Sequence, residues 1–304
     1  MSERRESEEV KEESGRGARW YVKKAARGGV AYGTWASGLL GASRLLRRGP
    51  RLRALTYHRV GDTPGDPFCV HRDDFEAQIR LLAEERRAVS LAQVQDFVAG
   101  TGTVPEDACI VTLDDGNISN LTEALPILRR WGVPAVFYVT SSLVGGDFEG
   151  LVERFMSADE LRELASSELV EIGAHARTHR SLGLMNIDEA RAEAKRSKDE
   201  LEDILGATVT SFAYPYGTRS DFSAETDRAV ADAGYDIAFN SMHGSIGGSS
   251  DPISLPRVKV EGGEPLMMFD LISHGAMDPW RAVDANLWRL QRVRKDITPD
   301  GVES

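Results

Sequence analysis

The feature that most constrains the fold is a regular alternation of short apolar runs with amphipathic segments, which begins near Leu52. Apolar runs such as ACIVTL at 108–113 are followed by segments with helical spacing, such as DDFEAQIRLLAEE, in which Phe75, Ile79 and Leu82 share one face. Strands that alternate with helices predict a parallel sheet. Six to eight such units fit the chain, which predicts a single domain built as a closed or nearly closed β/α barrel.

The composition limits the class of partner. A chain of 304 residues with 41% hydrophobic and 28% charged residues is typical of a soluble globular protein. The formal net charge of −11 argues against a general nucleic-acid binder, which needs a basic face, but does not exclude a neutral sugar. Cys69 and Cys109 show no paired spacing, so the sequence predicts no disulfide framework and leaves the redox compartment open.

The N-terminal region differs from the rest of the chain. Residues 1–17 form a mixed-charge, acidic tail that we expect to be disordered, and they do not have the pattern of a secretory signal. Residues 18–50 predict a basic and apolar helix, in which the uncharged run 28–43 is flanked by lysines and arginines. This run is short and glycine-rich for a spanning helix. A helix that lies on an anionic membrane surface, or packs on the main domain, fits better.

These boundaries leave residues 51–278 as the catalytic domain and 279–304 as a C-terminal helix with a frayed tail. The expected location is the cytoplasm or the cytoplasmic face of a membrane.

Polar clusters follow several of the predicted strands. Asp114 and Asp115 end one apolar run, and His175 and His179 follow another, four residues apart. Two histidines and one carboxylate would leave open positions on a metal ion, as in catalytic sites, and the second carboxylate could then serve as a base. The alternatives are a solvated Asp-Gly turn and a histidine pair used only in packing.

Three motifs carry a family resemblance. VTLDDG, HARTH and FAYPYG, in this order, resemble the leading motifs of the NodB-homology polysaccharide deacetylases, carbohydrate esterase family four. LTYHRV before them and LPRVKV after them extend the resemblance to about residues 52–275. It implies a distorted β/α barrel that holds one divalent ion, most commonly Zn²⁺, and hydrolyses the N-acetyl group of an amino sugar.

Carried over residue by residue, the resemblance gives each motif a role. Asp115, His175 and His179 would be the metal ligands, and Asp114 the general base. The backbone N–H of Tyr216 would help to bind the tetrahedral oxyanion.

The chain departs from the family pattern at three positions. Ala213 stands where the family usually has an arginine that pairs with the base, and we expect Arg257 of LPRVKV to reach back in its place; the alternative is a surface arginine. Leu113 replaces a phenylalanine, which is a tolerable apolar exchange. Asn117 replaces a residue that is often aromatic or acidic, which affects substrate contacts.

The general acid is not identified by a motif. His58, at the end of the first strand, resembles the histidine of the branch that acts on exopolysaccharide glucosamine, and we expect it in the active site with its role open; the alternative is a core histidine. His71 and His274 are expected to be structural or exposed, and His243 to lie in a loop.

The function that these observations favour is a metal-dependent N-deacetylase of an acetylated glycan, either a polymer or a lipid-linked precursor. Two alternatives remain at this point: hydrolysis of another amide or of an O-acetyl ester, and a non-catalytic barrel that binds glycan. We expect Tyr214 and Tyr216 to stack on a sugar ring, and Trp280 and Trp288 to serve in packing.

Overall fold

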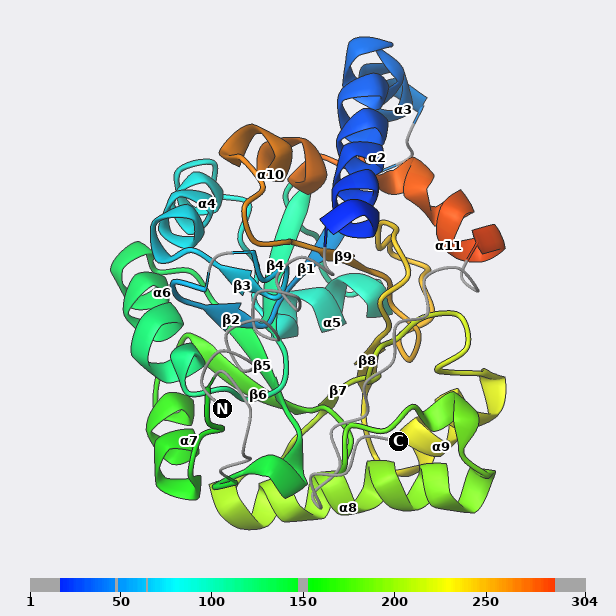
Figure 1. The fold of residues 1–304 in the computed structure, drawn as a ribbon. Helices are drawn as coiled ribbons and strands as arrows, with labels where there is room; N and C mark the ends of the chain where they lie inside the picture. Colours follow the sequence, from blue (N-terminus) through cyan, green and yellow to red (C-terminus); the bar gives the residue numbers. More distant parts are fainter. Residues whose placement is uncertain (1–16, 47–48, 64, 147–152, 288–304) are drawn as a thin grey trace, which may run out of the picture.

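The computed structural model describes residues 17–46, 49–63, 65–146 and 153–287. Its centre is a sheet of seven parallel strands in the order β8-β7-β6-β5-β4-β1-β9, which curves into a nearly closed barrel (Figure 1). The segment that precedes β9 narrows the remaining gap, because Phe239 of β8 forms a parallel bridge with Leu255. The single, nearly closed barrel predicted from the alternating pattern is therefore confirmed.

The seven strands share burial from both sides, as expected of parallel strands covered by helices. β4 follows this rule at all six of its positions. The strands are β1 Leu52–Tyr57, β4 Ala108–Leu113, β5 Ala135–Val139, β6 Val170–Ala174, β7 Ser211–Ala213, β8 Ile237–Phe239 and β9 Arg257–Lys259. A separate two-stranded sheet pairs β2 Arg59–Val60 with β3 Cys69–Val70 beside the end of β1.

Helices cover the outside of the barrel (Figure 1). They are α4 Arg72–Glu84, α6 Leu125–Trp131, α7 Ala158–Ala165, α8 Ile187–Leu205, α9 Ala224–Asp232, α10 Leu266–Ser273 and α11 Arg281–Leu287. α5 Leu91–Ala99 instead packs in a separate hydrophobic cluster with the other face of the strands, including Ile110 and Val136. Local sequence sets several of their ends. Ser157 and Asn186 form capping boxes that start α7 and α8, and Gly132 ends α6 in the left-handed conformation, as expected of a helix stop.

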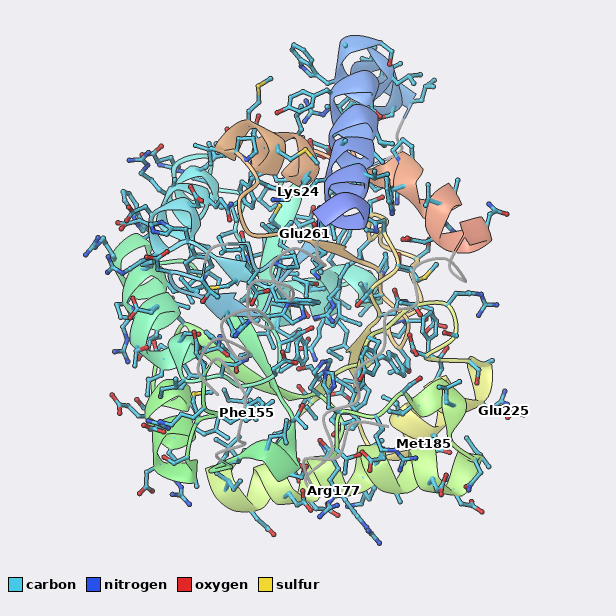
Figure 2. All side chains as sticks on the ribbon, in the orientation of Figure 1. Lys24, Phe155, Arg177, Met185, Glu225 and Glu261 are labelled. Carbon is cyan, nitrogen blue, oxygen red and sulfur yellow. The ribbon has the colours of Figure 1, made fainter. Side chains whose placement is uncertain are left out.

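The N-terminal region forms two helices, α2 Gly17–Ala36 and α3 Leu39–Leu46, instead of one. α2 packs on the barrel. The buried Arg27 donates to Glu264 and to the carbonyl of Lys259, and Lys24 donates to the carbonyl of Gly262 at 2.6 Å. Figure 2 shows Lys24 and Glu261 at this junction. The basic residues described here therefore face acidic groups of the protein itself.

Two expectations about the ends of the chain lie largely outside the described residues. They are the disordered tail at 1–17, of which only Gly17 is described, and the frayed end after Leu287, including Trp288. Among the described residues, no helix combines the length and the apolarity needed to cross a membrane.

Candidate active site

The two adjacent aspartates lie on a tight turn at the carboxyl end of β4. Asp115 has a φ of 77° and Gly116 a φ of 87°, so the chain passes through two left-handed residues in succession. A side chain at Gly116 would combine this conformation with a contact of 3.1 Å to Val139, which explains the glycine after the aspartates. The turn separates the two carboxylates, and each faces a different set of partners.

Asp114 is held by a buried arginine. Arg257 Nη1 donates to Asp114 Oδ1 at 2.7 Å and Nη2 donates to Oδ2 at 2.8 Å, and both side chains are almost fully buried. Burial raises the pKa of the Asp114 carboxyl, but Arg257 and then His175 outweigh it, so the pKa lies below its usual range. The pairing with Asp114 that was expected of Arg257, because Ala213 cannot make it, is thus present, although Arg257 lies 143 residues further along the chain.

The order of the strands explains how Arg257 reaches Asp114. β9 pairs with β1, and β1 pairs with β4, so residues at the same level of β4 and β9 are separated by one strand. Further contacts fix the guanidinium: Nε donates to the carbonyl of Asn240 at 3.1 Å, and Nη1 donates to Thr112 Oγ1 at 3.2 Å.

Asp115 faces the two histidines of HARTH. Its Oδ1 lies 3.4 Å from His179 Nε2 and 3.8 Å from His175 Nε2, and the three side chains form a group whose ligand atoms lie within 4.8 Å of one another. Oδ1 is buried and makes no hydrogen bond within the described residues. Burial raises the pKa of Asp115, but His179, His58 and His175 together lower it well below its usual range.

This group fits a divalent ion. Ligand atoms about 2.1 Å from one tetrahedral ion lie about 3.4 Å apart, close to the separations found here. His175 Nδ1 lies 2.7 Å from the carbonyl of Ala213, so this nitrogen donates and Nε2 presents its lone pair toward Asp115. Burial lowers the pKa of His175, which favours the neutral imidazole that a metal requires.

The backbone is unusual around this group. Six non-glycine residues of the described chain have positive φ, and four lie here: Asp115, Ala176 at 58°, His179 at 57° and Tyr216 at 59°. Residues in such conformations persist where the surrounding structure holds them, often at functional sites. The Tyr216 ring meets the His179 ring edge-on, with centroids 5.0 Å apart, which places the end of FAYPYG beside the histidines.

His58 packs against Phe68 and lies near both aspartates, whose charges act on its pKa. Burial lowers the pKa of His58 to about 4, although Asp115 and Asp114 act to raise it, and its Nδ1 is buried without a hydrogen bond in the described structure. Phe68 packs edge-on against His58 at 4.9 Å and keeps 45% of its surface exposed, while Lys259 Nζ lies 3.5 Å from its ring centroid. We did not foresee Phe68 from the sequence, because a single phenylalanine in a loop rich in proline and glycine carries no pattern.

One expected sugar contact is wrong. Tyr214 is fully buried, its ring packs against Phe212 and Phe222, and its hydroxyl donates to Asp227 at 2.8 Å. It therefore cannot stack on a sugar. Tyr216 is half-buried and reaches the site.

The remaining histidines lie elsewhere. His71 caps the start of α4, His274 follows α10 and contacts Asp270, and His243 lies in a loop where Asp284 holds its ring at 2.9 Å. Trp280 is buried, as expected of a packing residue.

Comparison with known proteins agrees with this geometry. Residues 101–238 match the family model for polysaccharide deacetylase. Over this range the chain is similar to polysaccharide deacetylases. The matched range includes Asp114, Asp115 and both histidines of HARTH, whereas His58 and Arg257 fall outside it. The places of these two residues in the site come from the structure.

Relatives and solved structures support the same family. The chain is 26% identical over 255 residues to the poly-β-1,6-N-acetyl-D-glucosamine N-deacetylase of Escherichia coli, covering 71% of this chain but only 37% of that protein. It is 23% identical to the enzyme of the same name from Staphylococcus aureus, covering 64% of this chain and 68% of that one. The structure of IcaB from Ammonifex degensii matches with a TM-score of 0.64 and 26% identity, covering 75% of this chain and 98% of that one.

Proposed function

We propose that the chain is a metal-dependent hydrolase that removes N-acetyl groups from amino sugars of the N-acetylglucosamine type, in a polymer or a lipid-linked glycan. The observation that carries this proposal is the different environment of two adjacent carboxylates. Asp115 has a buried oxygen without a hydrogen bond beside two imidazole nitrogens, and Asp114 is fully paired with Arg257. The first arrangement fits a metal ligand, and the second fits a base that must remain ionised.

Each residue of the site would have a separate role in the reaction. Asp115, His175 and His179 would hold one divalent ion, with Zn²⁺ the first choice for this ligand set, and a bound ion supplies an acidified water and a polarised acetyl carbonyl. Asp114 lies 3.9 Å from His175 Nε2, next to the ligand group, and accepts the proton of the attacking water. Arg257 keeps Asp114 ionised and oriented.

Three further residues would position the substrate. The backbone N–H of Tyr216 is assigned to the developing oxyanion, and His58 to a polar contact with the acetamido group. The exposed ring of Phe68 is assigned to stacking on the sugar, because it lies against His58. Its backbone is fixed beside the β2–β3 pair, where the Phe68 carbonyl accepts from the backbone N–H of Arg59.

Acetate release tests the proposal. Purified protein would be incubated with β-1,6-linked and β-1,4-linked N-acetylglucosamine oligomers, and with an O-acetylated xylan, before and after treatment with a chelator and after Zn²⁺ is restored. Chelator-sensitive release from an N-acetylated oligomer that Asp114→Ala and His175→Ala both abolish would support the proposal. Release from the xylan alone would change the substrate to an ester, and failure to bind any divalent ion would overturn the mechanism.

We also propose that residues 18–50 contact an anionic membrane surface, at the cytoplasmic face. The support is a group of exposed apolar side chains on α2 and α3, which are Val22, Trp35, Leu39, Leu45 and Leu46. Flotation with vesicles that contain anionic lipid tests this contact. Binding that Trp35→Ser and Leu39→Ser together abolish would support it, and a soluble fraction unchanged by vesicles would overturn it.

A further inference from the structure

The loop that carries both histidines is held from outside the barrel. His175 directly follows β6, His179 lies four residues later, and α8 begins at Ile187. Between the two histidines the backbone passes through a left-handed residue at Ala176, and His179 itself is left-handed. Such a loop keeps this shape only where other groups satisfy its polar atoms.

A single carboxylate on α8 satisfies three donors of this loop. Glu193 Oε2 accepts from the backbone N–H groups of Arg177 at 3.0 Å and Thr178 at 2.9 Å, and Oε1 accepts from Thr178 Oγ1 at 3.0 Å. The two backbone donors belong to consecutive residues that lie between the histidines. Glu193 therefore fixes the middle of the segment that separates them.

A second carboxylate on the same face of α8 supports the same segment. Glu200, two helical turns after Glu193, accepts from Arg177 Nε at 2.7 Å and from Ser141 Oγ at 2.5 Å. Figure 2 shows Arg177 beside α8. Ser141 lies just after β5, so this contact also ties the loop to the neighbouring strand end. The two glutamates therefore connect α8 to the loop at Arg177 and Thr178 and to the end of β5 at Ser141.

We propose that Glu193 is a positioning residue that holds His179 in its metal-binding orientation relative to His175. It touches neither the substrate nor the reacting atoms, and it acts through the backbone of Arg177 and Thr178. This inference rests on the ligand role given to His175 and His179 in the proposed function. Groups that orient metal ligands typically change metal affinity 10- to 100-fold when they are removed.

Three variants separate positioning from charge. Glu193→Ala removes all three acceptor contacts, while alanine favours the helix. Glu193→Gln keeps the shape: its carbonyl oxygen can accept from both backbone N–H groups, and its amide can donate to the Thr178 hydroxyl, which rotates to accept. Asp203→Asn removes a carboxylate from an exposed position of the same helix and serves as the matched control.

The measurement is the dissociation constant for Zn²⁺, by competition with a chromophoric chelator, on the full chain. We expect Glu193→Ala to weaken binding about tenfold or more, and Glu193→Gln and Asp203→Asn to stay within about threefold of the unmodified protein. The visible spectrum of the Co²⁺-loaded protein should change for Glu193→Ala and not for Glu193→Gln, because it reports the ligand geometry. Thermal melting of each metal-free variant verifies that it is folded.

Other outcomes would overturn the inference. If Glu193→Gln weakened binding as much as Glu193→Ala, the effect would be that of a negative charge near a cation. If Glu193→Ala lowered only the melting temperature and left the Zn²⁺ constant unchanged, the role would be structural. Should Glu193→Ala fail to fold, Thr178→Val removes one of the three contacts without altering α8, and unchanged Zn²⁺ binding and Co²⁺ spectrum would then count against the inference. A parent protein that binds no Zn²⁺ at all would instead refute the proposed function.

Discussion

The two sides of the site are held together in different ways. On the base side, which contains the proposed base Asp114, Arg257 donates two hydrogen bonds to the Asp114 carboxylate inside the barrel. On the metal side, Asp115 and the histidines converge with a buried carboxylate oxygen that makes no hydrogen bond in the described structure, and their loops are held by residues outside the barrel. Asp114 is therefore paired within the protein, whereas Asp115 and the two histidines are the residues that we propose bind a divalent ion.

The largest expected effect is on activity, at the metal side. Asp115→Asn should lower acetate release by at least about a thousandfold, because it removes a ligand charge, on the scale of other essential catalytic groups. The melting temperature of the metal-free protein should fall less than it does for Arg257→Met, because Asp115 Oδ1 has only the 3.4 Å contact with His179 Nε2, whereas Asp114 accepts two short hydrogen bonds. Acetate assays and thermal melting in chelator measure the two effects. A large loss of metal-free stability would contradict the contrast drawn between the two sides.

The largest expected effect on stability is at the base side. Arg257→Met should cost about 3–5 kcal/mol of the free energy of unfolding, because it leaves the Asp114 carboxylate buried without its partner. Urea unfolding at pH 7 measures this cost. The double variant Asp114→Asn with Arg257→Met should recover most of the stability but none of the activity. A cost below about 1 kcal/mol would mean that water or another group replaces the guanidinium.

A smaller, pH-dependent effect on the free energy of unfolding is expected at Asp227. Burial raises the pKa of Asp227, which accepts the Tyr214 hydroxyl, to about 6, and the charge of Asp251 adds to the shift. A carboxyl with a raised folded pKa contributes stability at low pH that is lost as the pH rises through about 4 to 6. At pH 8 the free energy of unfolding of Asp227→Asn should thus be about 1–2 kcal/mol higher than that of the parent, after allowance for the partial exposure of Asp227. At pH 4 the two proteins should have the same free energy of unfolding. Unfolding curves at the two pH values decide this, and equal differences at both would rule out the titration.

The smallest expected effect is on KM, at the exposed Phe68. Phe68→Ala should raise KM for an oligosaccharide about two- to tenfold and leave kcat and Zn²⁺ affinity unchanged, because stacking binds substrate and transition state alike. Phe68→Tyr, which keeps the ring, is the matched control. A fall in kcat would show instead that the ring orients His58.

Local patterns in the sequence predict the barrel. They also predict that Asp115, His175 and His179 lie close together, because motifs at the carboxyl ends of parallel strands meet at one edge of the sheet. The resemblance assigns the roles of Asp114, Asp115, His175 and His179, whose catalysis awaits the acetate assays. The hydrogen bonds of Arg257 could only be guessed, since they depend on β9 lying one strand from β4. Tyr214 was wrongly expected at the sugar because the pattern places FAYPYG at a strand end without showing that this ring turns into the core.

The sequence pattern also does not predict the direction in which charged side chains point. The basic residues beside the run 28–43 left open whether the helix lies on a membrane surface or packs on the main domain, and Lys24, Arg27 and Arg44 each meet an acceptor within the protein. The two helices of residues 17–46 are joined to the barrel through these contacts, and composition alone cannot distinguish an arginine that faces solvent from one that faces a buried glutamate.

The position of β9 has a consequence for how the protein is made on the ribosome. β9 is the last strand of the sheet in chain order, and it supplies Arg257 to a base that is synthesised 143 residues earlier. Until β9 has been made, β1 has an open edge and Asp114 has no guanidinium, so the nascent barrel must hold an incomplete sheet with an unpaired acid inside. Pairing over such a sequence separation is slow, and it follows the local helices and strands. Completion of the sheet and pairing of the Asp114 carboxylate would then be a single late event.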